Sequence, residues 1–376
     1  MDLSLTEEQK IIKKETRRVL SKECSKDIVR NLQKTREGYS IELWKIMASL
    51  GWPGLIIPEE YGGSGANFLD QLVLLEEMGR VCLPGPYFSN LVGTLALLEA
   101  ANEKQREKLL PQIASGKLLL TLALDEPGVR HDLNFIESQA RSTDDGYIVN
   151  GTKLFVENAH ISDLIIAAVK VDGSRTKDES LSLLAIETKN PNITITLIDS
   201  FGAEKQCEVS FSELKCPTVN LLGEPHLGVS YLRQLLPKVA LAKAAEMLGG
   251  AERAFELTCE YAKQRVQFGS PIGAYQIIQF YCADMLISLE AMRNLVYHAG
   301  WKLSNNFPFA KEAAMAKIWA DEAYKQITTL SFQIHGAIGF TEDYELSSHW
   351  LRNKPEQFVH GNSEYLSDLV AREIGL

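Results

Sequence analysis

The 376-residue sequence predicts an α+β protein in which a helical region, a β region and a helical bundle follow one another. Three observations predict this order. Apolar residues recur with a helical period before about residue 118, short β-rich runs separated by turn residues come next, and very long helical segments end the chain. A chain of this length usually forms two or three packed domains, which we place at residues 1–117, 118–227 and 228–376.

The first region has the pattern of packed helices. Thr6 and Gln9 have the spacing of a capping box at the start of a helix. Further helices are expected at residues 41–50, 68–78 and 105–113, from apolar spacing and from glycine or proline just beyond their ends. The segment 58–67 contains glycines that break either regular pattern, so it is expected to be a loop.

The middle region is expected to be an antiparallel sandwich or barrel. Its β-rich runs, at residues 146–149, 164–171, 181–186 and 193–198, are four to eight residues long and have no helix between them. The last region has helical patterns at 239–264, 275–304 and 309–334, each far longer than an average helix. Long antiparallel helices indicate a bundle.

Composition excludes several classes of function. The net charge is −10, which does not suit a nucleic-acid-binding protein. The apolar runs at 118–124 and 164–169 are too short to span a membrane, and no signal-peptide core is evident, so a cytoplasmic location is expected. Six scattered cysteines form no metal-ligand pattern, and we expect reduced, mostly buried thiols, with Cys259 and Cys282 as small core residues. No HExxH, GxSxG, P-loop or strand-flanked GxGxxG motif occurs.

Six landmarks are spaced along the chain. They are GWPGL with IPEEYGG at 51–63, LDEPG at 124–128, VNGTK at 149–153, EVSF at 208–211 with Pro217 and Gly223, RVQFG at 265–269 with Pro271, Ile272 and Gln276, and QIHG at 333–336. In this order they resemble the acyl-CoA dehydrogenase family over nearly the whole length. The resemblance implies an N-terminal α-helical domain, a middle antiparallel β domain and a C-terminal four-helix bundle.

The resemblance also implies a reaction and its cofactor. In the family, FAD lies between subunits, with its ring against the β domain of one subunit and its adenine end against a neighbour's bundle. A glutamate removes the α proton of an acyl-CoA thioester, the flavin takes the β hydride, and an electron-transfer flavoprotein reoxidises it. One fold can host several chemistries, so the function depends on the residues at the site.

The adenine-side positions match the family. By resemblance, Arg265 would reach the pyrophosphate of a neighbouring subunit's FAD, with Gln267 and Phe268 of the same motif beside it. Gln333 and Gly336 would meet the adenosine end, through a polar side chain and a close backbone approach. The alternative for Arg265 is a solvated cation at a helix end.

The ring-side positions depart from the family. Asp125 stands where a threonine is expected, Phe155 replaces an indole, and Glu157 replaces the threonine that donates toward the ring. Ionised carboxylates only accept hydrogen bonds and would oppose the negative charge of a reduced flavin. Arg130 and His131 are bulky where the family has glycine and serine. Glu126 is expected to orient the loop.

The base positions are changed too. The family's EGT segment is His-Gly-Asn at 360–362, so His360 stands for the glutamate, either as an unconventional base or as a residue with no catalytic role. The alternative base position falls near Val239, and a CoA-holding arginine falls at Ala240. Lys238 and Lys243 are nearby and are most simply surface lysines. His335 is expected to pack or to meet the adenine edge.

The hypothesis that fits best is that two different subunits share the work of binding the cofactor and catalysing the reaction. The chain would be the non-catalytic subunit of a heteromeric (α2β2) acyl-CoA dehydrogenase and would complete the FAD site of a catalytic partner. Its other partners would be the acyl-CoA substrate of the complex and an electron-transfer flavoprotein. One alternative is an active homo-oligomeric acyl-CoA dehydrogenase with His360 as base. Another is a family scaffold used for binding or for a non-redox acyl-CoA reaction.

Overall fold

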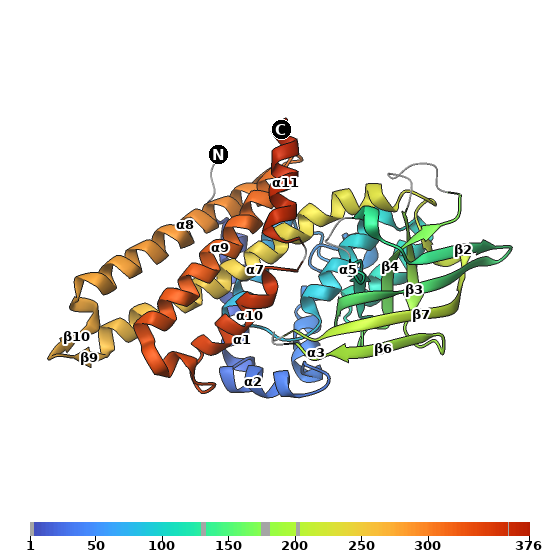
Figure 1. The fold of residues 1–376 in the computed structure, drawn as a ribbon. Coiled ribbons are helices and arrows are strands. Elements are labelled where there is room, and N and C mark those ends of the chain that lie inside the picture. Colours follow the sequence, from blue (N-terminus) through green and yellow to red (C-terminus); the bar gives the residue numbers. More distant parts are fainter. Residues whose placement is uncertain (1–3, 129–132, 174–180, 201–203, 360) are drawn as a thin grey trace.

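The computed structural model describes residues 4–128, 133–173, 181–200, 204–359 and 361–376. A helical layer, a β-sheet and a long helical bundle follow one another, and the bundle extends away from the sheet (Figure 1). This order confirms the predicted fold class. In the described part of the chain no helix is both long and apolar enough to cross a membrane.

The N-terminal helices form around the predicted signals. They are α1 (Glu7–Glu23), α2 (Lys26–Lys34), α3 (Ile41–Ser49), α4 (Phe68–Arg80), α5 (Tyr87–Ala100) and α6 (Glu103–Ala114). The capping box of Thr6 and Gln9 is present at the start of α1, with Thr6 Oγ1 accepting from the Gln9 backbone nitrogen at 3.2 Å. Helix α5 was not predicted, because it is apolar on nearly every face and shows no amphipathic period.

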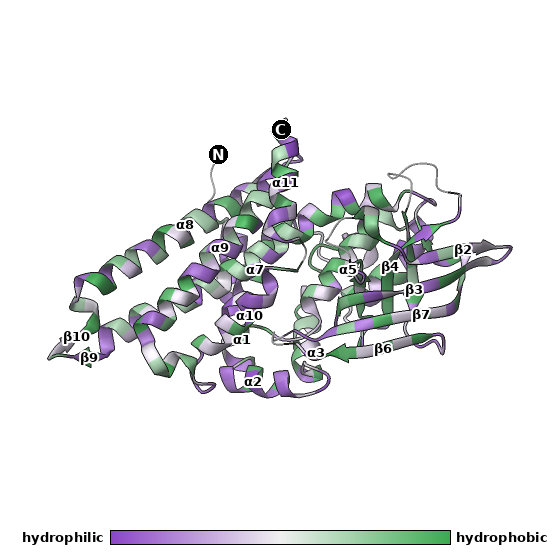
Figure 2. Ribbon diagram, in the orientation of Figure 1, coloured by the Kyte–Doolittle hydropathy of each residue, from purple (hydrophilic) through white to green (hydrophobic). Residues whose placement is uncertain are grey.

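The middle region is one sheet. Its strands are β1 (Leu120–Ala123), β2 (Gln139–Thr143), β3 (Gly146–Glu157), β4 (Leu164–Val171), β5 (Leu181–Glu187), β6 (Ile193–Ile198), β7 (Gln206–Pro217) and β8 (Leu221–Leu222), in the order β6-β7-β3-β2-β4-β5-β8 with β1 beside β4. Most pairs are antiparallel, as predicted, but β1 and β2 each run parallel to β4. Strand β4 is therefore buried on both faces, which explains its continuous hydrophobic run (Figure 2).

The bundle consists of α7 (Gly228–Gln264), α8 (Gln276–Ser304) and α9 (Ala310–His335), followed by the shorter α10 (Leu346–Glu356) and α11 (Ser363–Glu373). Helices α7 and α8 are joined by a small hairpin of β9 (Val266–Gln267) and β10 (Ser270–Pro271). The hairpin lies at the end of the bundle that is farthest from the sheet (Figure 1, left).

The N-terminal layer and the bundle are joined by a close crossing of α4 and α7. A Cβ atom added to Gly79 would lie 1.8 Å from the Glu246 carbonyl oxygen, and one added to Gly249 would lie 1.7 Å from the Glu76 carbonyl oxygen. Only glycine lets the two backbones approach so closely. The crossing fixes the position of α7, which also forms one wall of the cavity described next.

Candidate functional site

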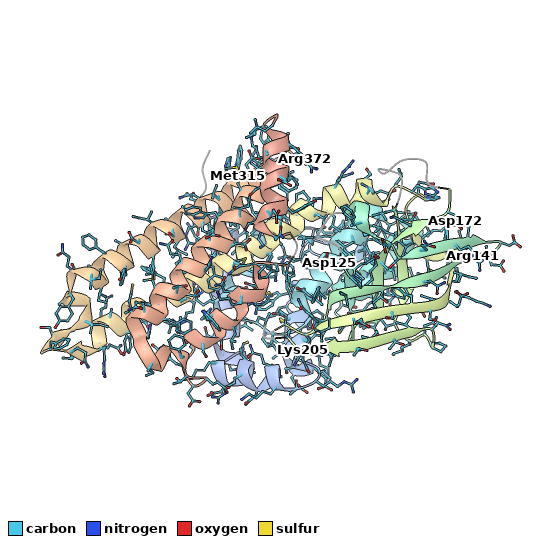
Figure 3. All side chains as sticks on the ribbon, viewed as in Figure 1. Asp125, Arg141, Asp172, Lys205, Met315 and Arg372 are labelled. Atoms are coloured by element: carbon cyan, nitrogen blue, oxygen red, sulfur yellow. The ribbon has the colours of Figure 1, made fainter. Side chains whose placement is uncertain are left out.

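A cavity of about 400 Å³ lies between the sheet and the bundle. Figure 3 shows Asp125 at this junction. Most of the wall is apolar, and its residues come from α5, the β1 end, β3, α7, α9 and the C-terminal segment: Val92, Leu122, Leu124, Asp125, Glu126, Leu154, Phe155, Glu157, Leu236, Pro237, Ala240, Ala314, Phe358, Val359, Gly361 and Leu366 among others. An apolar pocket with a few polar groups is the usual form of a ligand site.

The three ring-side residues that the sequence singled out do meet at this cavity. Asp125 follows β1, and its carbonyl oxygen accepts a hydrogen bond from the Leu154 nitrogen of β3 at 2.8 Å. Between Lys153 and Val156 the pairing of β3 with β7 shifts register, and Phe155 there has a φ of 55°. This bulge re-aims the strand so that Phe155 and Glu157 both reach the cavity wall.

Glu126 binds the backbone at residues 137 and 138, which is the kind of orienting contact that the sequence led us to expect of it. Its carboxylate accepts from the backbone nitrogens of Glu137 at 2.6 Å and Ser138 at 3.1 Å. The buried ammonium of Lys153 donates to Glu126 Oε1 at 2.5 Å. Burial lowers the pKa of Lys153 to about 8, although Glu126 opposes that shift. Burial would raise the pKa of Glu126, but the Lys153 charge outweighs it and the pKa is lowered.

A buried network of charged residues lies behind the part of the cavity wall that contains Glu157. Lys243 Nζ lies 2.7 Å from Glu246 Oε2 and 3.8 Å from Glu356 Oε1, and it sits 3.7 Å from the centre of the Phe88 ring. Arg352 donates to Glu246 at 2.6 Å and to Glu356 at 2.9 Å. Lys243 is therefore not a surface lysine, as the sequence suggested, but a fully buried one.

The network contains more carboxylates than cations. Glu204 Oε1 accepts no hydrogen bond within the described residues, although Arg352 Nη2 lies 2.9 Å away. Burial raises the pKa of Glu204 to about 7, and the Arg352 charge offsets only part of that effect. Glu157 interacts electrostatically with Lys243, so the network reaches the cavity wall. The spacings of Lys243 with Glu246 and of Arg352 with Glu356 predict an ion pair within each helix, but no sequence signal shows that the two pairs meet and are buried.

The predicted base positions lie on or near the cavity. Ala240 lines it together with Leu236 and Pro237, whereas Val239 is buried and is not part of the wall. None of these α7 side chains can accept a proton. Lys238 forms an ion pair with Glu99.

His360 lies outside the described residues. Its two chain neighbours, Val359 and Gly361, both line the cavity. Arg130 and His131 also lie outside the described residues.

The adenine-side motif lies at the opposite end of α7. Arg265, Gln267 and Phe268 are exposed on the hairpin, and 95% of the Phe268 surface is accessible. The backbone of the hairpin is well defined, because the Ile272 nitrogen donates to the Arg265 carbonyl at 2.8 Å and Tyr275 Oη donates to the Gln267 carbonyl at 2.8 Å. The backbone of this exposed motif is therefore held in one conformation by hydrogen bonds.

The second adenine-side motif is brought to the same end of the bundle. Tyr261 of α7 stacks on His335 at the end of α9, with the ring centres 4.3 Å apart. Gln333 and Gly336 are exposed beside this contact. Gly336 has a φ of 65°, and a Cβ atom added there would meet nothing within 4 Å, so its surface is open. His335 itself is buried, with Nδ1 2.7 Å from the Ser331 carbonyl and Nε2 3.0 Å from Tyr344 Oη.

An apolar surface continues from the hairpin along α8. Ile277, Phe280 and Ile287 are each more than half exposed and follow one another at helical spacing. Together with Phe268 they form what we call the α8 stripe. Large exposed apolar patches of this kind usually mark an interaction surface.

Comparison with known proteins gives a consistent family assignment. Residues 6–117, 121–214 and 227–375 match the N-terminal, middle and C-terminal domains of acyl-CoA dehydrogenases. The chain is 31% identical to the probable acyl-CoA dehydrogenase YngJ of Bacillus subtilis, over all of both chains. It is 33% identical to a 3-(aryl)acrylate reductase of Clostridium sporogenes, over 98% of this chain and 99% of the relative.

A solved structure agrees with this result. The butyryl-CoA dehydrogenase of Megasphaera elsdenii superposes with a TM-score of 0.92 at 30% identity, and all of both chains is covered. The cavity between sheet and bundle, the exposed hairpin and the full-length match lead to the same conclusion: this protein belongs to the acyl-CoA dehydrogenase family.

Proposed function

We propose that this chain is the non-catalytic subunit of a heteromeric acyl-CoA dehydrogenase and completes the FAD site of a catalytic partner subunit. The observation that carries the proposal is the contrast between the two ends of α7. One end presents a formed and exposed adenine-side surface, while the other end meets a cavity whose polar groups are poorly suited to a flavin ring.

The two ends are far apart. Ala240 lines the cavity, and Arg265 directly follows the last residue of α7. The stretch of helix between these two residues is about 38 Å long. An extended dinucleotide does not reach both. The Arg265 surface therefore serves a cofactor whose ring lies in another subunit, as the family resemblance implies.

The ring side of this chain fits FAD poorly. Asp125 and Glu157 are in the wall where the family has hydroxyl donors, and both are acceptors when ionised. Glu157 also interacts electrostatically with the buried network, in which the carboxylates of Glu204, Glu246 and Glu356 outnumber the two cations Lys243 and Arg352. A reduced flavin gains negative charge, and this environment would oppose it. We therefore derive no catalytic step at this cavity.

The adenine side fits. Arg265 would bind the pyrophosphate of the partner's FAD, with Gln267 and Phe268 covering it, and Gln333 and Gly336 would contact the adenosine end. When bound, FAD supplies the two-electron acceptor for α,β-dehydrogenation of an acyl-CoA, and an electron-transfer flavoprotein would be the next acceptor. The α8 stripe would be covered by the same partner.

The test is reconstitution. The chain is purified alone and after co-expression with a glutamate-bearing acyl-CoA dehydrogenase chain encoded beside it, and subunit ratio and flavin content are measured. We expect little flavin in the chain alone and a mixed complex with flavin and dehydrogenase activity. Arg265→Ala in this chain should remove flavin from the complex, whereas Arg372→Ala, in the C-terminal helix, should not. A homotetramer that retains one FAD per chain would overturn the proposal.

A second candidate is an active homo-oligomer with His360 as base. It is favoured by the positions of Val359 and Gly361 in the cavity wall. In that case His360→Ala should abolish exchange of the α proton of a bound acyl-CoA with solvent, while FAD content stays the same. Unchanged exchange would exclude His360 as the base.

A further inference from the structure

His335, the last residue of α9, is held by contacts on several sides. Its ring is buried and stacks on Tyr261 of α7, with the ring centres 4.3 Å apart and the ring planes inclined by 23°. Its Nδ1 atom lies 2.7 Å from the carbonyl oxygen of Ser331, and its Nε2 atom lies 3.0 Å from the hydroxyl of Tyr344. A buried ring with a partner at each nitrogen is fixed in one orientation.

The carbonyl contact determines which group donates at the other ring nitrogen. A carbonyl oxygen only accepts, so Nδ1 of His335 carries a proton and donates to Ser331. Burial lowers the pKa of His335, so the imidazole is neutral at neutral pH and Nε2 carries no proton. The Tyr344 hydroxyl therefore donates to Nε2. Phenylalanine at this position would keep the aromatic ring and remove the donor.

Tyr344 belongs to a short segment before α10 that binds both α7 and α9. The next residue, Glu345, accepts from Nε and Nη2 of Arg253 in α7 at 2.8 and 3.0 Å. A carboxylate that binds a guanidinium through two hydrogen bonds has a well-defined geometry. Tyr344 and Glu345 therefore connect the end of α9, through His335, to α7.

His335 is flanked by the two residues that the proposed function assigns to the adenosine end of FAD. Gln333 lies two residues before it on α9, and Gly336 follows it with a φ of 65° and a ψ of −145°, which glycine tolerates. The orientation of His335 thus affects how both residues are presented. On the basis of the proposed function, we propose that Tyr344 is a positioning residue for the adenosine end of the cofactor. It acts through His335, which holds Gln333 and Gly336 in place.

The effect of losing the Tyr344 hydroxyl should be selective. Without it, Nε2 of His335 is left buried with no donor, and a lost hydrogen bond of this kind corresponds to roughly a 3- to 10-fold change in an equilibrium constant. FMN contains the flavin ring and one phosphate but no adenosine. Binding of FAD should therefore weaken, while binding of FMN should not change.

The first experiment compares the two flavins. The flavin-free form of the assembly that the full chain forms is titrated with FAD and, separately, with FMN, and binding is followed by flavin fluorescence. We expect Tyr344→Phe to raise the Kd for FAD roughly 3- to 10-fold and to leave the Kd for FMN unchanged. Tyr231→Phe is the matched control and should change neither, because the Tyr231 hydroxyl binds the Glu224 nitrogen near the other end of α7. An unchanged Kd for FAD, or an equal loss for both flavins, would overturn the proposal.

A second set of variants tests whether Tyr344 acts through His335. His335→Leu removes the acceptor, and adding Tyr344→Phe to it should cause no further loss of FAD affinity. His335→Gln keeps an amide oxygen that can accept from Tyr344 and should retain more affinity than His335→Leu. An additive loss in the double variant would show that Tyr344 does not act through His335 and would overturn the proposal.

The proposed function is tested by a separate measurement. The subunit composition of the assembly tests whether the chain needs a catalytic partner, whereas the ratio of the Kd values for FAD and FMN tests the role of Tyr344. The titration serves a mixed complex and a homo-oligomer equally, because the family resemblance implies that the adenosine end meets a neighbouring subunit in both.

Discussion

Replacing Lys243 with methionine would test the buried charge network directly. Lys243 is fully buried in α7 and is shared by the carboxylates of Glu246 and Glu356. Although burial opposes the charged form, these carboxylates raise the pKa of Lys243, so it stays protonated in the folded chain. Methionine keeps much of the volume and removes the charge, which leaves Arg352 as the remaining cation of the network.

The expected loss of stability follows from burial. Removing one partner of a buried ion pair leaves an uncompensated charge and costs about 3–5 kcal/mol. For a chain of 376 residues, an unfolding entropy of about 2.1 cal/mol/K per residue converts this to a lower melting temperature by roughly 4–6 °C. The double variant Lys243→Met/Glu246→Gln removes part of the uncompensated charge and should recover about half of that loss.

The assay is thermal melting followed by circular dichroism, with urea unfolding as a second measure. Lys238→Met is the matched control, since Lys238 lies on the same helix and pairs with Glu99 but is only partly buried. It should cost about 1 kcal/mol or less. If Lys243→Met melts no lower than Lys238→Met, or if the double variant is less stable than the single one, the argument from an uncompensated buried charge is refuted.

Three further predictions use other features. The folded pKa of Glu204 is about 7, above the ordinary 4.5, so the native chain retains a proton that the unfolded chain loses, and stability falls as pH rises through this window. In urea unfolding, Glu204→Gln should remove this loss of stability with rising pH. The variant should be more stable than the wild type by up to about 3 kcal/mol at about pH 8 and should show no gain at about pH 4. The same dependence of stability on pH in both proteins would contradict the prediction. Gly249→Ala should cost about 3 kcal/mol or more in melting experiments, because its Cβ would lie 1.7 Å from a carbonyl oxygen of α4; a wild-type melting temperature would show that the helices can separate freely. Phe268→Ala should change the stability of the chain alone by less than about 0.5 kcal/mol, because the side chain is 95% exposed, yet lower the flavin content of the complex; full flavin content would argue against its role.

Much of the fold could be predicted from local patterns. The period of apolar residues located α4 and the bundle helices, and continuous β-rich runs located β4 and β6 to the residue. Helix α5 could not be found in this way, since a helix buried all round has no amphipathic period. The parallel pairing of β1 with β4 depends on where the chain enters the sheet, which no local pattern records.

Some residues of the candidate site could be predicted from the sequence, and others could not. Landmark motifs located Asp125, Glu157 and the exposed Arg265 surface, because each is flanked by recognisable residues. The burial of Lys243 was not predictable, since it depends on Glu356 and Arg352 arriving from a segment about one hundred residues away in the chain.

The α8 stripe has a consequence for how the chain behaves when it is made. A chain without a partner keeps Phe268, Phe280 and Ile287 in contact with water, at the outer face of a bundle that is otherwise well packed. Such surfaces favour association with unrelated proteins and capture by chaperones or proteases. Under the proposed heteromeric assembly, synthesis together with the partner chain would cover this surface and protect the chain.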